Sequence, residues 1–367
     1  MKITTQIIRQ GYDGRHCLVH ARACAAPGEM IATAQYLDVS GSDLFSGIQM
    51  SRSGKAWGEF VPQEGLAPIR RPDGAILVGC DATPLYHKKT GRVLLLGHTA
   101  AYRPDSTSPI HDGSVGRSTF YSVLAGDAFC PMELLSMPPG YENCGNGSGQ
   151  SVELDNGDLL IPVYFSSCRP ELAGEKGAAR QSLYACAVIR CAFDGERLTF
   201  LSVGNALTIQ GGRGLYEPSI VRWNGSYWMT MRSDGEGYLA QSTDGLHYGT
   251  PQVWRWDDGS ILPTYNTQQH WMICANALYL VYTRRGAGND HVFRHRAPLF
   301  AAQVENLRLI RSSEQIIVPE RGARLGNFGV FSLSDGRAGV MAAEWMQPTG
   351  CERYGSNNAI YLSFAQG

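Results

Sequence analysis

The sequence predicts an all-β protein, and three observations lead to that fold class. Helical periodicity is nearly absent, and almost every apolar segment is a short run rich in Val, Ile, Leu, Tyr and Trp. The runs end at Gly, Asp, Asn or Ser, and Gly supplies 43 of the 367 residues, more than the roughly 7 % of ordinary proteins. Tight hairpin turns stand at Asn156-Gly157, Asn224-Gly225 and Asp335-Gly336. Short strands joined by tight turns are therefore expected along the chain.

The clearest strands can be placed in chain order. Each is a run of aliphatic and aromatic residues bounded by turn residues, which is the usual pattern of a short strand. These runs are residues 75–78, 93–96, 159–164, 227–231 and 278–282.

A weak internal repeat groups the strands. Each unit reads as an extended segment, a turn with Gly, an apolar strand and one or two further strands, recurring roughly every 45–70 residues. The units are Gly79–Thr99, Gly149–Phe165, Tyr216–Arg232, Thr267–Arg284 and Asn327–Trp345. Four short strands per ~50 residues are typical of a β-propeller, in which radial repetition protects the sheet edges. The length predicts seven blades, with five or six as alternatives, in a single domain over residues 1–367 closed between its two ends.

Two segments resemble the Asp-box turn of sialidase-like propellers, S-x-D-x-G-x-x-W. The better copy is Ser242–Tyr248, with one residue missing and Tyr in place of Trp; a more degenerate copy is Ser51–Trp57. In such a turn the carboxylate accepts hydrogen bonds from backbone N–H groups while the aromatic ring packs beneath it. Asp244 is therefore expected to have a structural role.

Composition excludes several classes of function. Lys and Arg total 32 against 33 for Asp and Glu, a net charge of −1, so the basic excess of a nucleic-acid-binding protein is missing. No apolar run reaches the 18 or so residues of a membrane span. Met1–Gln6 lacks the apolar core of a signal peptide, which predicts a cytoplasmic protein or an exported one whose signal precedes this numbering. The ten cysteines form no CxxC pair, so buried free thiols are expected rather than a zinc or redox motif.

The order of the strands predicts which residues lie together in a candidate site. In a propeller, the starts of the first strands, the ends of the second and the starts of the third share one face. The residues at these places are rich in His, Arg and Tyr, although the chain is neutral overall. A cationic cup on a neutral protein suggests an anionic small ligand or sugar acid. The Asn224-Gly225 turn further predicts that Tyr216 and Arg232 are neighbours across one strand pair.

The runs 81–98, 215–219, 268–271 and 289–300 are similar to the sialidase/BNR-like superfamily, and within it to the propeller polysaccharide lyases of the ulvan and rhamnosyl-glucuronate type. These lyases use a Tyr and an Arg at the spacing of Tyr216 and Arg232, and His98 matches a His of an early blade. The resemblance implies β-elimination beside a uronic acid in an anionic oligosaccharide or polysaccharide. A second family His has no counterpart, and His87 or His111 could substitute for it.

In that mechanism three residues are expected to be catalytic. Arg232 neutralises the carboxylate and stabilises the enolate-like charge, Tyr216 acts as base or acid, and His98 supplies the complementary proton transfer. The expected substrate-binding residues are His87, Glu217, Gln269, His270, Arg284, His291, Arg294 and Arg296. No cofactor or catalytic metal is expected, and a structural calcium or zinc ion is left open.

Two other functions stay open. Hydrolysis in the manner of a sialidase needs a Tyr nucleophile with a Glu, an Asp acid and three arginines on a carboxylate. The residues available for it are Tyr216, Glu217, Asp81, Arg232, Arg284 and Arg296, although an early Arg-Ile-Pro motif is missing. The third function is a non-catalytic sugar-binding propeller, which needs the cationic cup without an activated Tyr or His.

Overall fold

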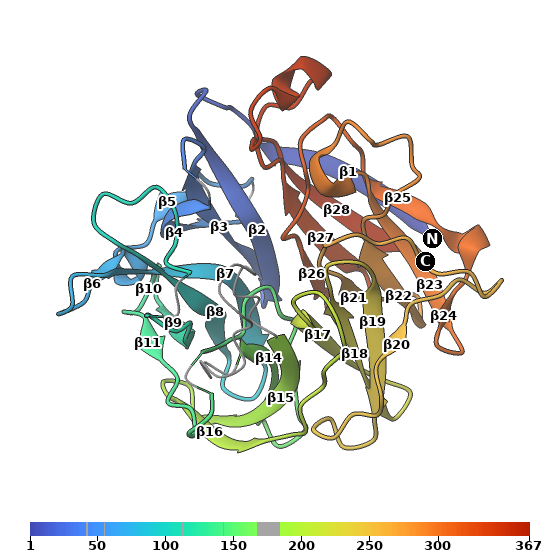
Figure 1. Ribbon diagram of the computed structural model, residues 1–367, viewed down its shortest axis with the longest axis horizontal. Coiled ribbons are helices and arrows are strands. Elements are labelled where there is room, and N and C mark those ends of the chain that lie inside the picture. The colour runs from blue at the N-terminus through green and yellow to red at the C-terminus, as the bar shows by residue number, and fades with distance from the viewer. Residues whose placement is uncertain (42, 55, 112–113, 142, 167–183) are drawn as a thin grey trace.

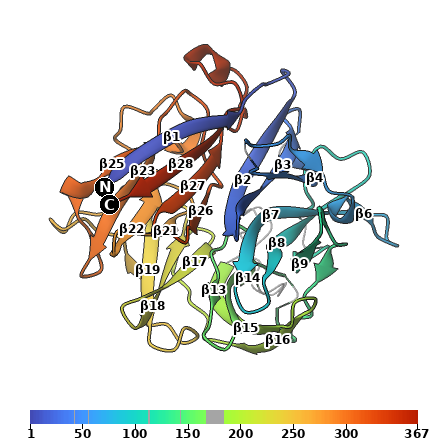
Figure 2. The same cartoon turned by 180° about the vertical axis from the view of Figure 1, so that it is seen from behind.

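The computed structural model describes residues 1–41, 43–54, 56–111, 114–141, 143–166 and 184–367. Six antiparallel sheets stand in a ring around a central axis, as Figure 1 shows from one face and Figure 2 from the other. The fold is thus an all-β propeller, as predicted, but with six blades rather than seven. The blades are longer than the assumed repeat because extra short strands and long connections extend several of them.

The first three blades follow one another along the chain. The first blade contains β2 (His16–Ala26), β3 (Glu29–Asp38), β4 (Leu44–Arg52) and β5 (Val61–Pro62). The second contains β7 (Ile76–His87), β8 (Arg92–Tyr102) and β9 (Thr119–Ala125), with the short strands β6 (Ile69–Arg70), β10 (Ala128–Phe129) and β11 (Glu133–Leu134). The third contains β12 (Cys144–Gly145) and β13 (Val152–Glu153), then β14 (Leu159–Ser166), β15 (Tyr184–Phe193) and β16 (Leu198–Val203).

The remaining blades complete the ring. The fourth contains β17 (Tyr216–Trp223), β18 (Ser226–Arg232), β19 (Gly237–Ser242) and β20 (Gln252–Val253). The fifth contains β21 (His270–Cys274), β22 (Ala277–Tyr282), β23 (Leu299–Glu305), β24 (Arg308–Leu309) and β25 (Gln315–Val318). The sixth contains β26 (Gly329–Ser332), β27 (Ala338–Ala343), β28 (Ile360–Gln366) and β1 (Lys2–Arg9). Short 3-10 helices lie in the connections: η1 (Glu64–Leu66), η3 (Phe293–His295), η4 (Arg311–Ser313) and η5 (Cys351–Tyr354).

The sixth blade joins the two ends of the chain. β1 is its outer strand and pairs antiparallel with β28, from Lys2 opposite Gln366 to Arg9 opposite Ile360. Figures 1 and 2 both show the two termini side by side at the end of this pair. The ring is therefore closed by backbone hydrogen bonds between its first and last strands.

Inner segments of five blades share one backbone feature. A non-glycine residue there takes a left-handed φ between 49° and 63°, and three of these positions coincide with a β-bulge in the inner strand. Bulges re-aim a side chain and increase local twist. The residues are His20, Asp81, Ser148, Glu217 and Asn327.

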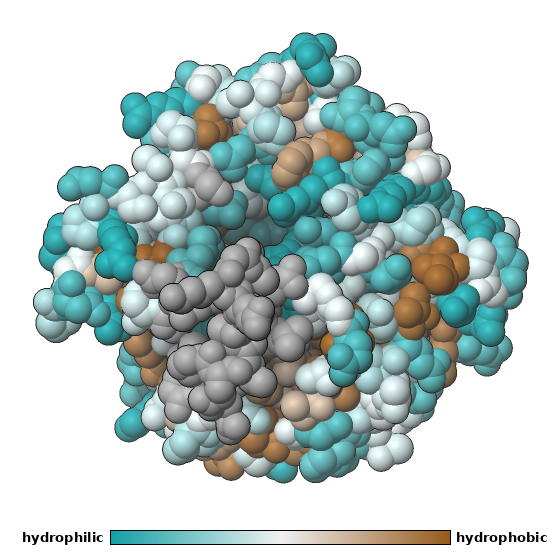
Figure 3. All heavy atoms as spheres, viewed as in Figure 1, coloured by the Kyte–Doolittle hydropathy of each residue, from teal (hydrophilic) through white to brown (hydrophobic). Residues whose placement is uncertain are grey.

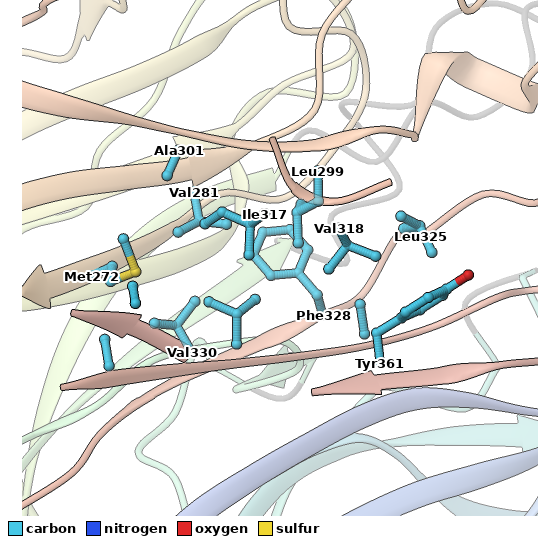
Figure 4. Packing of buried hydrophobic residues seen from close by; sticks show 14 of the residues in the cluster. Met272, Val281, Leu299, Ala301, Ile317, Val318, Leu325, Phe328, Val330 and Tyr361 are labelled. Carbon is cyan, nitrogen blue, oxygen red and sulfur yellow. The ribbon is translucent and has the colours of Figure 1, made fainter. Parts of the chain in front are cut away.

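Hydrophobic residues fill the space between neighbouring blades. Figure 4 shows this between the fifth and sixth blades, where Phe328 lies among Val281, Leu299, Ile317 and Val330. Similar clusters separate the other blades, which fits faces of sheets packed on one another. The nine described cysteines are free thiols, eight of them buried, as the sequence predicts. Among the described residues no helix is both long and apolar enough to span a membrane.

Candidate functional site

Tyr216 and Arg232 are directly opposite each other on β17 and β18. Asn224 and Gly225 form the turn between these strands with left-handed φ values of 47° and 77°, and this turn sets the register. The guanidinium of Arg232 lies 4.6 Å from the centre of the Tyr216 ring. The predicted adjacency of the two residues is confirmed.

The Tyr216 hydroxyl is surrounded by three polar partners. It lies 2.8 Å from Oδ1 of Asp234 and 2.9 Å from Oδ1 of Asn266, and it accepts a hydrogen bond from Nη2 of Arg213 at 2.7 Å. Arg213 in turn forms an ion pair with Asp234 at 2.7 Å. Burial raises the pKa of Tyr216 to about 12, although Arg232 and Arg213 act in the opposite direction. The phenol is therefore protonated at neutral pH, with a carboxylate in place to accept its proton.

Four arginines, which we call the arginine cluster, interact with one another, and two of them, Arg232 and Arg294, also interact with Tyr216; the four are Arg232, Arg294, Arg296 and Arg324. Arg232 forms an ion pair with Glu217 at 2.5 Å and donates to the Asn266 side chain. Arg296 is buried and donates to the backbone carbonyl of Asn266 through Nη2 at 2.6 Å. Asn266 thus holds Tyr216, Arg232 and Arg296 together.

Three members of the arginine cluster form no ion pair among the described residues, although Asp43 is near enough to Arg294 and Arg324 to interact with their charges. Among the described residues, no carboxylate lies within ion-pair distance of Arg294, Arg296 or Arg324. Burial, followed by the charge of Arg232, lowers the pKa of Arg296 well below its usual value. Burial also lowers the pKa of Arg324 to about 9, and its guanidinium packs 3.7 Å from the Trp345 ring. An anion bound here would stabilise these crowded positive charges.

A second group of residues packs beside the Tyr216 ring. The ring centres of Tyr164 and Tyr184 are 6.3 and 5.8 Å from that of Tyr216 and 5.5 Å from each other. The guanidinium of Arg117 packs 4.8 Å from the Tyr164 ring. Tyr164 lies near the end of β14 and Tyr184 at the start of β15, so two strands of the third blade provide the tyrosines of this group.

His98 lies next to the same tyrosines. Its ring centre is 6.0 Å from that of Tyr164, and its Nε2 is 3.9 Å from the Asp81 carboxylate. Burial, followed by the charge of Arg117, lowers the pKa of His98 to about 3, so the imidazole is neutral. Its Nδ1 is buried and has no hydrogen-bond partner among the described residues. His98 and Arg232 come from the second strands of their blades and Tyr216 from a first strand, and the structure brings all three around Tyr164, as strand order predicts.

Asp81 forms the centre of a buried network at the propeller axis. Its carboxylate accepts hydrogen bonds from Arg22 at 3.1 Å, Ser148 at 2.9 Å and Asn327 at 2.8 Å, and His20 is 3.3 Å away. The nearby positive groups hold its pKa far below the usual range despite burial. A carboxylate bound in this way is a poor proton donor, so the sequence-based choice of Asp81 as an acid has no support.

Three predicted substrate-binding residues are not in the group around Tyr216. His87 is at the opposite end of β7, where it bonds to Thr90 and to the carbonyl of Gly157 within the hairpin turns. Arg284 forms a 2.5 Å ion pair with Glu314 and packs on Phe300, so its charge is compensated. His291 is on the rim, paired with Glu320 at 2.8 Å.

Gln269 and His270 make hydrogen bonds to strands of the fourth blade and so hold the fourth and fifth blades together. The Gln269 side chain accepts a 2.6 Å hydrogen bond from Thr230 of β18, and Nδ1 of His270 lies 2.6 Å from the hydroxyl of Ser219. Both residues are almost fully buried between blades. Of the predicted substrate-binding residues, Glu217, Arg294 and Arg296 are the ones placed in the cluster around Tyr216.

Sequence reasoning missed six residues that complete the site: Arg117, Tyr184, Arg213, Asp234, Asn266 and Arg324. Tyr184 begins β15, and the other five lie in connections between the named strands. Two of them could have been found from their position in the sequence, because Arg213 lies three residues before Tyr216 and Asp234 two residues after Arg232.

The Asp-box turn has the predicted structure. The Asp244 carboxylate accepts hydrogen bonds from the backbone N–H groups of Leu246 at 2.9 Å and His247 at 2.8 Å, and Tyr248 is buried. The turn follows β19, on the outer side of the fourth blade and away from Tyr216. Its geometry supports a structural role.

No protein-family model and no curated protein matches the sequence. Solved structures do match over nearly the whole chain. A protein of unknown function from Dyadobacter fermentans is 14 % identical, with a TM-score of 0.68 over 99 % of this chain and 98 % of that one. Trypanosoma rangeli sialidase is 15 % identical, with a TM-score of 0.66 over 99 % of this chain and 59 % of that one.

The NanB sialidase of Streptococcus pneumoniae is 12 % identical, with a TM-score of 0.64 over 98 % of this chain and 70 % of that one. The match to the Trypanosoma rangeli sialidase covers 59 % of that protein, so this chain spans little more than half of its length. At these identities the likeness concerns the fold. The chain folds as a sialidase-like β-propeller.

Proposed function

We propose that the protein is a carbohydrate-active enzyme that hydrolyses a glycosidic bond next to an anionic sugar. The supporting observation is the arginine cluster, in which three buried or half-buried guanidinium groups without a carboxylate partner among the described residues lie beside a hydrogen-bonded phenol. Buried positive charges without partners are costly, so such a site is suited to a ligand carboxylate. The fold shared with two sialidases is consistent with this choice. Figure 3 shows the face viewed in Figure 1 hollowed near the axis, with hydrophilic residues around the hollow.

The proposed first step forms a bond between the Tyr216 oxygen and the anomeric carbon. As the phenol attacks, its proton passes to Asp234, which is 2.8 Å away, while Arg213 holds both groups. A phenol is preferable to a carboxylate as the nucleophile here because it is neutral and is not repelled by the sugar's negative charge. Arg232, Arg296 and Arg324 hold the sugar carboxylate.

The leaving oxygen needs a proton as its bond to the anomeric carbon breaks. Asp43, before β4, is the proposed donor, because its half-buried side chain lies near Arg294 and Arg324 of the arginine cluster; it takes up the proton from solvent before the step. The backbone of Asp43 has a left-handed φ of 49°, and its carbonyl accepts a 2.6 Å hydrogen bond from Tyr102. In the second step water attacks the anomeric carbon and gives a proton to Asp43, and Tyr216 recovers its proton from Asp234.

β-Elimination is the second candidate, and it is favoured by the surroundings of His98. A neutral imidazole with a free Nδ1 can take up a proton, and Tyr164 lies between it and Tyr216. Against this, burial gives His98 a pKa of about 3, which makes it a weak base. A sugar-binding protein without activity is the third candidate.

One experiment separates the three candidates. The protein is incubated with oligosaccharides ending in sialic acid or in a uronic acid, and products are followed by mass, reducing sugar and absorbance near 235 nm. Hydrolysis releases reducing sugar and adds the mass of one water without a rise in absorbance. A rise in absorbance indicates an unsaturated uronate and elimination, which would overturn the proposal. Binding without products would indicate a lectin-like protein.

A further inference from the structure

We propose that Arg117, Tyr164 and Tyr184 form a second anion-binding subsite, so that the preferred substrate carries two acidic groups, one bound by the arginine cluster and one by Arg117. The inference rests on the proposed function and specifies its substrate class. The second acidic group is a carboxylate or a sulfate ester, which a guanidinium binds in the same way.

Arg117 is a positive charge without an acidic partner. Within the described part of the chain no carboxylate lies at ion-pair distance from its guanidinium, and its Nη1 is buried without a hydrogen-bond acceptor. The rest of the guanidinium contacts two tyrosines: it lies 4.8 Å from the ring centre of Tyr164 and 5.7 Å from that of Tyr184, and a side-chain hydrogen bond with Tyr184 helps to raise the pKa of Arg117. Ring faces stabilise a cation only modestly, and Nη1 of Arg117 still lacks an acceptor for a charge-assisted hydrogen bond.

The Arg117 side chain is held in place before any ligand binds. A side-chain carbon added at Gly145 of β12 would lie 2.4 Å from Cδ of Arg117 and 2.6 Å from Cβ of His98. Glycine at this position therefore lets the arginine stem pass close to the inner segment of the third blade. The backbone N–H of Arg117 is bound to the Asn143 side chain at 2.8 Å. Such preorganisation lowers the entropy cost of binding an anion.

Arg117 packs on a different ring from Arg232 of the arginine cluster. Arg232 lies 4.6 Å from the centre of the Tyr216 ring and Arg117 lies 4.8 Å from that of Tyr164, and the two ring centres are 6.3 Å apart. Glu217, already paired with Arg232, also interacts with Arg117. A sugar carboxylate held by the arginine cluster leaves Arg117 free for another acidic group. The Tyr164 hydroxyl, which has no hydrogen bond among the described residues, is available to the same ligand.

The test compares three disaccharides that share a non-reducing uronic acid. In the first the second sugar is neutral, in the second it carries a carboxylate, and in the third it carries a sulfate ester. Binding is measured by calorimetry and turnover by kcat/KM for the wild type, Arg117→Gln and Arg117→Lys. Arg222→Gln is the matched control, because that arginine pairs with Asp155 at an exposed hairpin. Thermal unfolding confirms that each variant is folded.

We expect the wild type to prefer at least one dianionic disaccharide by tenfold or more. Arg117→Gln should lose most of this preference, with a fall of about 30-fold on the dianionic substrate and a much smaller fall on the monoanionic one. Arg117→Lys should keep part of it, and Arg222→Gln all of it. Equal losses on all three substrates, or a wild type without the preference, would overturn the second subsite while leaving the proposed function intact. Failure to bind any of the three would overturn the second subsite; it would overturn the proposed function as well only if oligosaccharides ending in sialic acid also fail to bind.

Discussion

The hydroxyl of Tyr216 lies 2.8 Å from the carboxylate of Asp234 and accepts a hydrogen bond from Arg213. If this pair performs the chemistry, Tyr216→Phe should lower kcat by a factor of about 10² or more. Loss of the hydroxyl also removes hydrogen bonds, which costs about 1–2 kcal/mol of stability. Kinetics and thermal unfolding of the same preparation separate these effects, and near-full activity of the variant would exclude a catalytic role for Tyr216.

Arg296 is expected to bind the substrate carboxylate in the ground state as well as in the transition state, so its replacement should affect KM more than kcat. Arg296→Lys keeps a positive charge but loses the planar fork, so KM should rise about tenfold while kcat changes little. Arg284→Lys is the control, since Arg284 is already paired with Glu314 outside the site. A larger kinetic effect at Arg284 than at Arg296 would contradict the assignment of the arginine cluster as the carboxylate site.

His98 distinguishes hydrolysis from elimination. In the proposed hydrolysis it takes no part in proton transfer, so His98→Ala should keep kcat within about threefold of the wild type once the folded fraction is known. In an elimination the same change would lower kcat by a factor of about 10². Measuring turnover of one substrate by both variant and wild type decides between the two.

Asp244 should matter for stability and not for catalysis. Asp244→Ala leaves the backbone N–H groups of Leu246 and His247 without their acceptor, which should cost about 1–3 kcal/mol. Asp155→Ala, which removes only an exposed ion pair with Arg222, should cost less than about 1 kcal/mol. Chemical unfolding measures both values, and a variant with lowered kcat and unchanged stability would reverse this interpretation.

Stability should decrease as the pH falls from about 6.5, the pKa of an unfolded histidine. Burial lowers the pKa of His98 and His270 to about 3 and that of His20 to about 4, so the unfolded chain binds protons that the folded protein does not. Each histidine then contributes at most about 1.4 kcal/mol per pH unit. Urea unfolding at pH 7.5 and pH 5.0 measures the effect; equal stability at the two values would show that these histidines are accessible to protons when folded.

The fold was predictable from local signals, but the blade number was not. A two-residue turn at Asn224-Gly225 sets the register of β17 and β18, and alternating turns and apolar runs mark the other strands. The count of blades depends on how many residues the connections use, and short extra strands such as β6, β11 and β25 give no clear sequence signal. The prediction of a propeller is therefore confirmed, whereas the prediction of seven blades is wrong.

Strand geometry alone predicted which residues lie close together, whatever their role. Tyr216, Glu217 and Arg232 lie at the ends of paired strands, and Arg296 follows in the next blade's connection. The residues that were missed, such as Asp234 and Asn266, come from loops whose paths depend on contacts between blades. His87 was included by resemblance to a family, and the direction of β7 places it at the other end of the strand.

The pairing of β1 with β28 has a consequence for synthesis in the cell. Five sheets consist of consecutive segments and can form as the polypeptide emerges, whereas the sixth needs Lys2–Arg9 to meet Ile360–Gln366. The first strand must therefore wait, unpaired, until translation has passed residue 366. During this interval the edge of β1 is exposed to other nascent chains, so ribosome-associated chaperones are well placed to affect the yield of closed molecules.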